Sequence, residues 1–294
     1  MADKKLDARL NAYRADLAAA SLEGSVDAPK YAAGDVRQVV AAAAPVRRLP
    51  RFDAPLDTEA LHGELVRVFD ESEGWAWGQL ERDRYVGYLP AECLSTHIAE
   101  PTHKVRALRT FAYPADDIKT PPLELLSFGS SVRLMGLSGD FVQIGSNRFL
   151  FARHVVPFEA VETDFVSVAM RFVGTPYLWG GRQSLGLDCS ALVQLALSSA
   201  GVACPRDSDM QEAELGDPLP DPEDISALQR GDLLFWTGHV AIVAGDGQLL
   251  HANAFHMETV IEPLAPALAR IESGHAKVRA VKRLAGACLE RTSD

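Results

Sequence analysis

The chain has 294 residues, of which 47% are hydrophobic and 23% are charged, a composition typical of water-soluble globular proteins. Its length predicts two or three domains rather than one hydrophobic core. The formal net charge of −11 argues against nucleic acid or an anionic membrane surface as the main partner.

Residues 1–34 are expected to form an N-terminal arm or a short helix. Charges at Lys4, Lys5 and Asp7 stand where a secretory signal would need its apolar segment. No uninterrupted apolar stretch of about 18 residues is present, so we expect no membrane span. The four cysteines are too few for a disulfide scaffold and fit a reducing compartment. The sequence therefore predicts a cytoplasmic protein.

Residues 35–98 are expected to form a small β-barrel. Short apolar runs separated by Gly and Asp are typical of such a barrel. The expected strands span 35–42, 45–50, 63–70, 74–80 and 85–90. The order Val66-Arg67-Val68-Phe69-Asp70, Gly74-Trp75-Ala76-Trp77 and Gly87-Tyr88-Leu89-Pro90 resembles a bacterial SH3-like domain.

A second barrel of the same type is expected over residues 99–158. Its strands are predicted at 105–108, 128–136, 139–144 and 149–152, with Thr120-Pro121-Pro122 in an inserted loop. The tryptophans of the first barrel have no counterpart here, which favours a structural role over a binding role.

The last domain, residues 159–285, contains the candidate nucleophile Cys189. Asp188 is a suitable N-cap for an apolar helix that includes 191–197 and that Gly201 would end. A cysteine in the first helical turn lies near unpaired N–H groups and the positive end of the helix dipole, which stabilise a thiolate. The alternative interpretation, for a lone cysteine, is that Cys189 is only a small apolar residue buried in the helix.

Two histidines further along the chain favour the catalytic interpretation. His239 opens an apolar run, and Gly245-Asp246-Gly247 predicts a hairpin turn after it. His251 then falls on the partner strand, where it could share a face with His239. A nucleophile, a base and a third group that orients the base form the general arrangement for nucleophilic catalysis.

Several segments in this part of the chain closely resemble the NlpC/P60 cysteine peptidases of bacterial cell-wall peptides. They are Tyr177–Gly181, Leu187–Gln194, Arg206–Ser208, Gly231–Trp236 and Gly238–Val243, and the resemblance spans about 160–285. It implies an α+β, papain-like domain, preceded here by two small SH3-like β-barrels. It also implies Cys189 as nucleophile, His239 as base, His251 as the orienting residue, and an oxyanion site near Tyr177 and the Cys189 backbone N–H.

Together with two SH3-like barrels, this domain resembles the γ-D-glutamyl-L-diamino acid endopeptidases, also called dipeptidyl-peptidase VI. The resemblance implies hydrolysis of the γ-D-Glu–diamino acid bond in murein peptides with a free N-terminal L-Ala, which releases L-Ala-D-Glu without a cofactor. It further implies that the first barrel closes one end of the substrate groove. The substrate-binding residues would be Tyr177, Trp179, Asp188, Ser190, Asp207, Ser208, Tyr88 and Glu59.

Several of these assignments leave alternatives. Trp179 could belong to the core, and Glu64 is the alternative to Glu59; both acids are expected in loops. His256 is expected in a loop, and Cys93 and Cys204 are expected to be free thiols. A tail is expected over 286–294.

Two other classes of function compete with a cysteine peptidase. Cys189, His239 and His251 could bind zinc in a hydrolase, because Cys and His ligands with one open position suit that metal. Alternatively, the chain could be a binding protein for wall peptides with an inactive peptidase domain. The complete Cys/His/His set argues against the second alternative.

Overall fold

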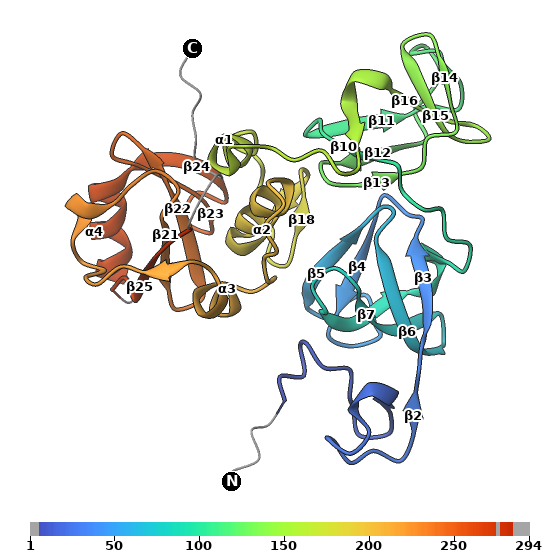
Figure 1. Cartoon of the computed structure of the whole chain (residues 1–294), viewed down its shortest axis with the longest axis horizontal. Coiled ribbons are helices and arrows are strands. Elements are labelled where there is room, and N and C mark those ends of the chain that lie inside the picture. The colour runs from blue at the N-terminus through green and yellow to red at the C-terminus, as the bar shows by residue number, and fades with distance from the viewer. Residues whose placement is uncertain (1–5, 275–276, 285–294) are drawn as a thin grey trace. The chain divides into compact units, whose positions relative to one another are not determined.

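The computed structural model describes residues 6–274 and 277–284, and the chain divides into two compact units, up to Glu159 and from Ala160 (Figure 1). The first unit consists mainly of strands, whereas the second combines a sheet with helices, so the predicted α+β fold is confirmed. No helix within the described ranges has the length and apolarity needed to cross a membrane. Cys288 and the predicted tail lie outside the described residues.

The described part of the N-terminal segment, residues 6–32, is an arm without an α-helix. Its regular elements are a parallel strand pair and one 3-10 turn, namely β1 (Ala18–Ala19), β2 (Tyr31–Ala32) and η1 (Ala20–Leu22). Ala12, Leu17 and Ala19 are buried in a cluster that also contains Trp77 of the first barrel. The arm therefore packs on that barrel through apolar side chains.

Arg14 strengthens the contact between the arm and the first barrel. Its Cζ atom lies 4.7 Å from the centroid of a Trp77 ring, and its guanidinium forms an ion pair with Asp70. It also donates a hydrogen bond to the Tyr88 hydroxyl at 3.4 Å. These contacts connect the arm to a residue that the sequence assigns to substrate binding.

The first barrel is built on one seven-stranded sheet in the order β5-β4-β8-β7-β6-β3-β9. Alternate residues such as Val46, Val66, Val68 and Leu89 fill its core. Its strands are β3 (Asp35–Val39), β4 (Ala43–Arg47), β5 (Leu56–Leu61), β6 (Leu65–Ser72), β7 (Trp75–Leu80), β8 (Val86–Pro90) and β9 (Leu94–Ser95), with the 3-10 turn η2 (Ala91–Cys93).

The structure corrects one prediction in this barrel. Glu59 does not lie in a loop; it belongs to strand β5, where it pairs with Pro45 and is 7% exposed. The polar residues Asp57, Thr58 and Glu59 concealed this strand, because an amphipathic pattern predicts strands and a polar run does not.

The second barrel consists of three small sheets around Val105, Leu126, Val142 and Leu150. The predicted insertion Thr120-Pro121-Pro122 lies between two of its strands. Its elements are β10 (His103–Val105), β11 (Arg109–Ala112), β12 (Glu124–Ser127), β13 (Ser131–Val132), β14 (Gly136–Ser138), β15 (Phe141–Gly145), β16 (Arg148–Phe151), η3 (Ala152–His154) and β17 (Val155–Pro157).

The second unit contains a six-stranded antiparallel sheet in the order β20-β25-β21-β22-β23-β24. One face, which includes Leu234, Trp236 and Val243, packs against Leu264 and Leu268 of helix α4. The helices are α1 (Phe165–Met170), α2 (Cys189–Ser199), α3 (Ser208–Glu214) and α4 (Leu264–Gly274). The other elements are β18 (Arg182–Gln183), β19 (Gly186–Leu187), β20 (Asp217–Pro218), η4 (Ile225–Ala227), β21 (Leu233–Trp236), β22 (His239–Gly245), β23 (Gln248–Asn253), β24 (Glu258–Pro263) and β25 (Ala280–Arg283).

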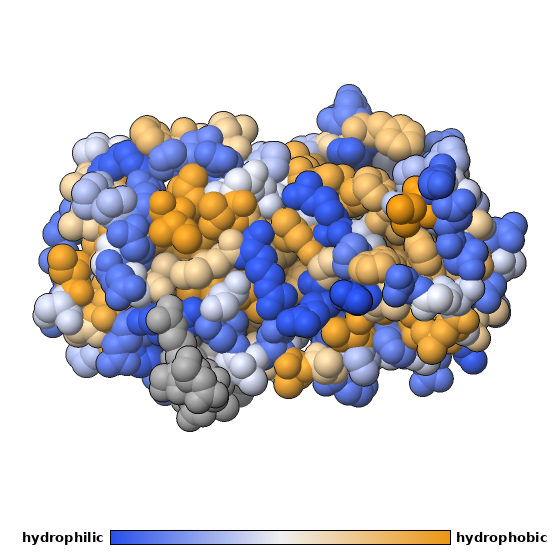
Figure 2. Space-filling model, turned by 90° about the horizontal axis from the view of Figure 1, so that it is seen from above, coloured by the Kyte–Doolittle hydropathy of each residue, from blue (hydrophilic) through white to orange (hydrophobic). Residues whose placement is uncertain are grey.

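Apolar side chains also reach the surface of both units, and Figure 2 shows hydrophobic residues interspersed with hydrophilic ones over one face of the molecule. In the second barrel, Ile118, Met135 and Leu137 are exposed. Isolated apolar residues of this kind are normal on protein surfaces and need no functional explanation.

We predict that Arg14→Ala loosens the arm without unfolding the barrel. A partly exposed cation–π contact and an ion pair of this kind contribute about 1–2 kcal/mol together, so amides 10–20 should exchange with solvent about tenfold faster. Hydrogen exchange with mass spectrometry measures this directly. Arg51→Ala is the matched control, because Arg51 forms an exposed ion pair with Asp53 on the same unit. Equal exchange rates in the wild type and Arg14→Ala would contradict the role of Arg14.

Candidate active site

Cys189 is the first residue of the buried helix α2. Asp188 has the extended backbone of an N-cap, and its carboxylate accepts a hydrogen bond from the Ala191 backbone N–H at 2.9 Å. This agrees with the predicted cap. Gly201 follows the helix with a φ of +77°, in the left-handed region that favours glycine. The thiol is therefore fixed by a capped helix whose residues are almost all buried.

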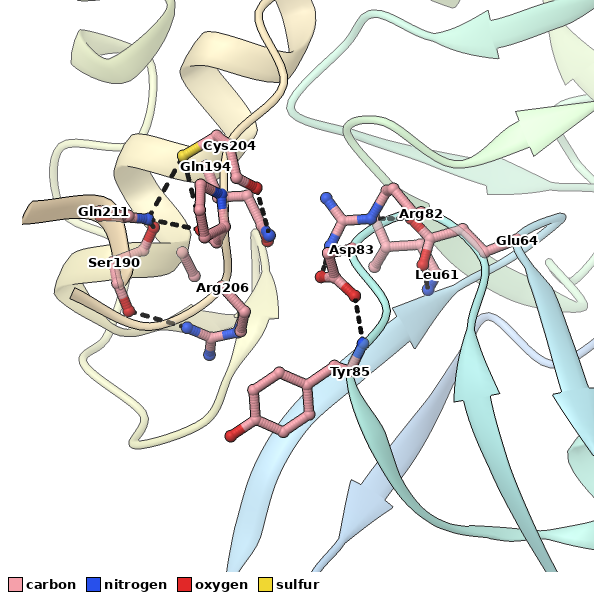
Figure 3. A network of polar contacts seen from close by, with 12 residues as sticks. Leu61, Glu64, Arg82, Asp83, Tyr85, Ser190, Gln194, Cys204, Arg206 and Gln211 are labelled. Atoms are coloured by element: carbon pink, nitrogen blue, oxygen red, sulfur yellow. Dashed lines mark hydrogen bonds and ion pairs between the residues drawn. The ribbon is translucent and has the colours of Figure 1, made fainter. Parts of the chain in front are cut away.

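The Asp188 carboxylate is held by a buried ion pair with Arg206. The guanidinium of Arg206, 1% exposed, donates to the two Asp188 oxygens at 2.9 and 2.7 Å and to the Ser190 hydroxyl at 2.9 Å. Asp188 also accepts the Gly180 backbone N–H at 3.0 Å and the Ser190 hydroxyl at 3.1 Å. Figure 3 shows Arg206 pointing toward Ser190. These contacts fix the turn before Cys189, because each buried charge is paired and hydrogen-bonded.

Gln211 of α3 ties the loop before that helix to the start of α2. Its buried side-chain amide donates to the Ser190 carbonyl at 2.9 Å and to the Pro205 carbonyl at 2.9 Å. It also donates to the Cys204 sulfur at 3.4 Å (Figure 3). Cys93, Cys189 and Cys204 are all free among the described cysteines, which confirms the prediction for Cys93 and Cys204.

The surroundings of the Cys189 thiol differ from the predicted ones. Burial is the main influence, and with the nearby Asp188 charge it raises the pKa of Cys189 to about 12. Backbone N–H groups of Val240 and Ser190 face the sulfur, and they and Arg206 lower this pKa by a smaller amount. This raised pKa contradicts the expectation of a stabilised thiolate at the helix start, because loss of hydration outweighs the helix terminus.

His239 is the residue before Val240, so the Cys189 sulfur lies beside the start of strand β22. The His239 ring forms a hydrogen bond through Nε2 with Nδ1 of His251 at 2.9 Å. His251 is 1% exposed, and its pKa is lowered to about 3 by burial and by the nearby Arg270 and His256. The structure thus brings together the three residues that the sequence assigns to catalysis.

The hairpin between β22 and β23 explains this juxtaposition. Gly245, Asp246 and Gly247 all have positive φ, which glycine adopts readily and aspartate adopts more often than most residues. The register pairs Ile242 with Leu250, which leaves the His239 and His251 side chains on one face of adjacent strands.

Two polar residues beyond the histidines were not found from the sequence. The second ring nitrogen of His251, Nε2, is hydrogen-bonded to the Glu262 carboxylate at 2.8 Å, and Glu262 forms an ion pair with Arg270 of α4. His251 is paired with Val260 in the β23–β24 hairpin, so Glu262, two residues further along, shares its face. Recognition of a second hairpin after Asn253 could have revealed this contact.

The hydrogen bonds of His251 also argue against the alternative of a zinc site. Both nitrogens of His251 are engaged, one by His239 and the other by Glu262, so neither has a lone pair directed at a metal. The donor set of Cys189, His239 and His251 therefore fits a hydrogen-bonded catalytic chain better than a zinc site.

Tyr177 and Trp179 lie on the turn-rich segment before Cys189. Burial and the charges of Cys189 and Asp188 raise the pKa of Tyr177, which places its hydroxyl near both residues. Trp179 is 65% exposed, so the core alternative for this residue is wrong. The Tyr177 backbone N–H donates to the Met257 carbonyl at 2.9 Å, which joins this segment to the β23–β24 turn.

That turn carries His256, which is exposed as expected for a loop residue. Asp188 and Ser190, which the sequence assigns to substrate binding, are buried and make the contacts with Arg206 described above. Those contacts support a structural role for both residues.

The remaining predicted substrate-binding residues occupy three elements. Asp207 is at the N-cap position of α3 but makes no capping hydrogen bond, and Ser208 is the first residue of that helix. Tyr88 is half-buried on β8, and Glu59 is buried on β5. Glu64 contacts its own barrel, since it accepts the Leu61 N–H at 3.0 Å and pairs with Arg82 at 3.1 Å (Figure 3).

Two sequence families match the chain. Residues 174–268 match the NlpC/P60 family, and residues 46–94 match the bacterial dipeptidyl-peptidase SH3 domain. The first match includes Cys189, His239 and His251, and the second includes Glu59 and Tyr88.

Curated proteins give similar matches over most of the chain. "Dipeptidyl-peptidase 6" of Lysinibacillus sphaericus is 27% identical over 241 residues, which cover 73% of this chain and 86% of that protein. "Gamma-D-glutamyl-L-lysine dipeptidyl-peptidase" of Bacillus cereus is 29% identical over 241 residues, which cover 71% of each chain.

A solved structure of an NlpC/P60 family protein from Bacillus cereus has the same fold. It superposes with a TM-score of 0.70 over 85% of this chain and 99% of that one, at 20% sequence identity. The predicted papain-like domain with SH3-like barrels is thereby confirmed. The chain therefore contains an NlpC/P60 domain, which is preceded by a bacterial SH3 domain.

Proposed function

We propose that the chain is a cysteine peptidase that cleaves the γ-D-Glu–diamino acid bond of murein peptides with a free N-terminal L-Ala. The products would be L-Ala-D-Glu and the remainder of the peptide, beginning with the diamino acid. One observation carries the proposal: the Cys189 sulfur faces the Val240 N–H beside His239, and His239 is hydrogen-bonded to His251. The names of two relatives, a dipeptidyl-peptidase and a γ-D-glutamyl-L-lysine dipeptidyl-peptidase, support the substrate class.

The mechanism begins with a protonated thiol, because burial raises the pKa of Cys189 to about 12. His239 accepts the thiol proton as the sulfur attacks the γ-carbonyl carbon of D-Glu, and His251 holds the His239 ring during this transfer. The C–N bond then breaks, and the leaving amine takes the proton from His239. Water, activated by His239, hydrolyses the thioester and restores the thiol.

The oxyanion formed in each step requires hydrogen-bond donors. The Cys189 backbone N–H lies at the start of α2, where N–H groups have no partner within the helix. Together with the Tyr177 hydroxyl, which lies near Cys189, it supports an oxyanion site at this position.

The requirement for a free L-Ala amine follows from the proposed release of a dipeptide, since such a release demands recognition of the N-terminus. We assign this recognition to Asp207, Tyr88 and Glu59, whose carboxylates and hydroxyl can accept hydrogen bonds from an ammonium group. Trp179 and Ser208 would contact the rest of the peptide. In the intact wall this L-Ala is joined to muramic acid, so the substrate would be a released fragment.

We therefore place the reaction in murein peptide recycling in the cytoplasm. A reducing compartment keeps a nucleophilic thiol active, and the free state of Cys93, Cys189 and Cys204 is consistent with it.

Cys189→Ala should abolish cleavage and leave the fold intact, because an alanine methyl group fits the space of the thiol but cannot attack a carbonyl. We expect less than about a thousandth of wild-type kcat/KM, against accelerations of 10⁶-fold or more that are typical of enzymes. The assay incubates L-Ala-γ-D-Glu-diaminopimelate with the protein and detects L-Ala-D-Glu by mass spectrometry. Cys204→Ala, which removes a second buried thiol, is the control and should retain activity. Wild-type activity in Cys189→Ala would exclude this nucleophile.

The rate at which iodoacetamide alkylates Cys189 should increase continuously as the pH rises. Because the thiol pKa is raised to about 12, the reactive thiolate is a minor species at neutral pH and grows about tenfold per pH unit up to pH 9–10. Peptide mapping after timed labelling gives the rate at Cys189 itself. A plateau between about pH 5 and pH 8 would instead reveal a preformed thiolate–imidazolium pair.

Acetylation of the substrate's N-terminal amine should lower kcat/KM by about a hundredfold or more. The modification removes the positive charge and most of the N–H donors that we assign to these acceptors, at about 1–3 kcal/mol for each lost contact. Glu59→Gln should reduce the difference between free and acetylated peptides by slowing cleavage of the free peptide.

Glu64→Gln is the matched control, since Glu64 already contacts Leu61 and Arg82 within its barrel. It should leave the preference for the free peptide unchanged. Equal cleavage of both peptides by the wild type would show that the amine is not recognised.

A further inference from the structure

We infer that Glu262, held by Arg270, is a positioning residue that selects the tautomers of His251 and His239 and so directs the basic nitrogen of His239 toward Cys189. This inference rests on the proposed cysteine-peptidase function and extends the catalytic chain by two residues. Its basis is the continuous series of contacts from His239 through His251 and Glu262 to Arg270.

The tautomer of His251 follows from its two partners. His251 is 1% exposed, and burial lowers its pKa to about 3, so the ring is neutral and carries a single N–H. A carboxylate can only accept a hydrogen bond. Since Glu262 lies 2.8 Å from Nε2 of His251, the proton must be on that nitrogen, and Nδ1 must be an acceptor.

The tautomer of His239 follows in turn. Its Nε2 lies 2.9 Å from Nδ1 of His251, which accepts, so Nε2 of His239 must donate. A neutral His239 then has its lone pair on Nδ1, and we assign to that nitrogen the acceptance of the thiol proton. When His239 becomes protonated, its Nε2–H can keep the same bond to His251. The proton transfer therefore requires no rearrangement of the chain.

Arg270 keeps Glu262 in place for this role. The Glu262 side chain is 16% exposed and the Arg270 side chain 27% exposed, so their ion pair is shielded from water on most sides. The Arg270 guanidinium also lies over the Phe255 ring, with Cζ 4.1 Å from the centroid. Arg270 is thus held by both Glu262 and Phe255. Its positive charge balances the Glu262 carboxylate, which lies beside the buried neutral ring of His251.

The direct test is NMR spectroscopy of the whole protein labelled with ¹⁵N-histidine, which distinguishes the two tautomers of each ring. We expect His239 and His251 both to carry the proton on Nε2 in the wild type. In Glu262→Gln the side chain can donate as well as accept, so His251 should become a mixture of tautomers and His239 should change with it. A wild-type His251 protonated on Nδ1, or wild-type tautomers retained in Glu262→Gln, would overturn the inference.

Kinetics provide a second readout. Glu262→Gln should lower kcat about a hundredfold with little change in KM, because substrate binding does not involve the tautomer, and Arg270→Lys should have a smaller effect of the same kind. Glu258→Gln is the matched control, because Glu258 lies on the same strand and is exposed. It should retain wild-type tautomers and rates. Unchanged kcat in Glu262→Gln would also overturn the inference.

The two proposals can fail separately. If the wild type cleaves the murein peptide but its tautomers are not as stated, the positioning role of Glu262 is wrong and the peptidase function stands. If the tautomers and their response to Glu262→Gln are as stated but no peptide is cleaved, the proposed substrate and reaction are wrong.

Discussion

The contact between the start of helix α2 and the start of strand β22 is the constraint on which the catalytic assignment depends. It places the Cys189 sulfur against the Val240 N–H and therefore beside His239. Neither element provides a catalytic group alone: a buried thiol with a raised pKa is a poor nucleophile, and a histidine at the start of a strand has nothing to deprotonate. The packing of a helix against a sheet thus places the candidate nucleophile beside the candidate base.

Buried polar contacts hold both sides of this arrangement in place. On the helix side, Arg206 pairs with the carboxylate of Asp188, which also caps α2. On the sheet side, Glu262 anchors His251. Ionised groups are buried here only because their partners satisfy them, and removal of one partner would leave an unpaired charge whose cost is commonly about 3–5 kcal/mol. We expect such pairs to make the site rigid.

The sequence predicted the elements that carry the candidate catalytic residues with good accuracy. The cap at Asp188, the apolar helix and the Gly245-Asp246-Gly247 turn are local patterns, so a single sequence reveals them. Strand β5 was missed because its middle is polar, and the burial of Glu59 depends on neighbouring strands rather than on local sequence.

Contacts between different elements could not be predicted from local sequence patterns. Arg270 reaches Glu262 only because α4 packs on the sheet, and Arg14 reaches Trp77 only because the arm packs on the first barrel. The pKa of Cys189 was predicted in the wrong direction for a related reason: the helix terminus is visible in the sequence, whereas the extent of burial is a property of the whole unit.

The most direct test of the central claim is to trap the acyl-enzyme. The protein is mixed with a single equivalent of L-Ala-γ-D-Glu-diaminopimelate, quenched in acid within the first turnover and digested for mass spectrometry. We predict that the peptide containing Cys189 carries an L-Ala-D-Glu acyl group as a thioester and that the adduct is absent in Cys189→Ala. Formation of L-Ala-D-Glu at the wild-type rate with the acyl group on another residue would contradict catalysis by Cys189.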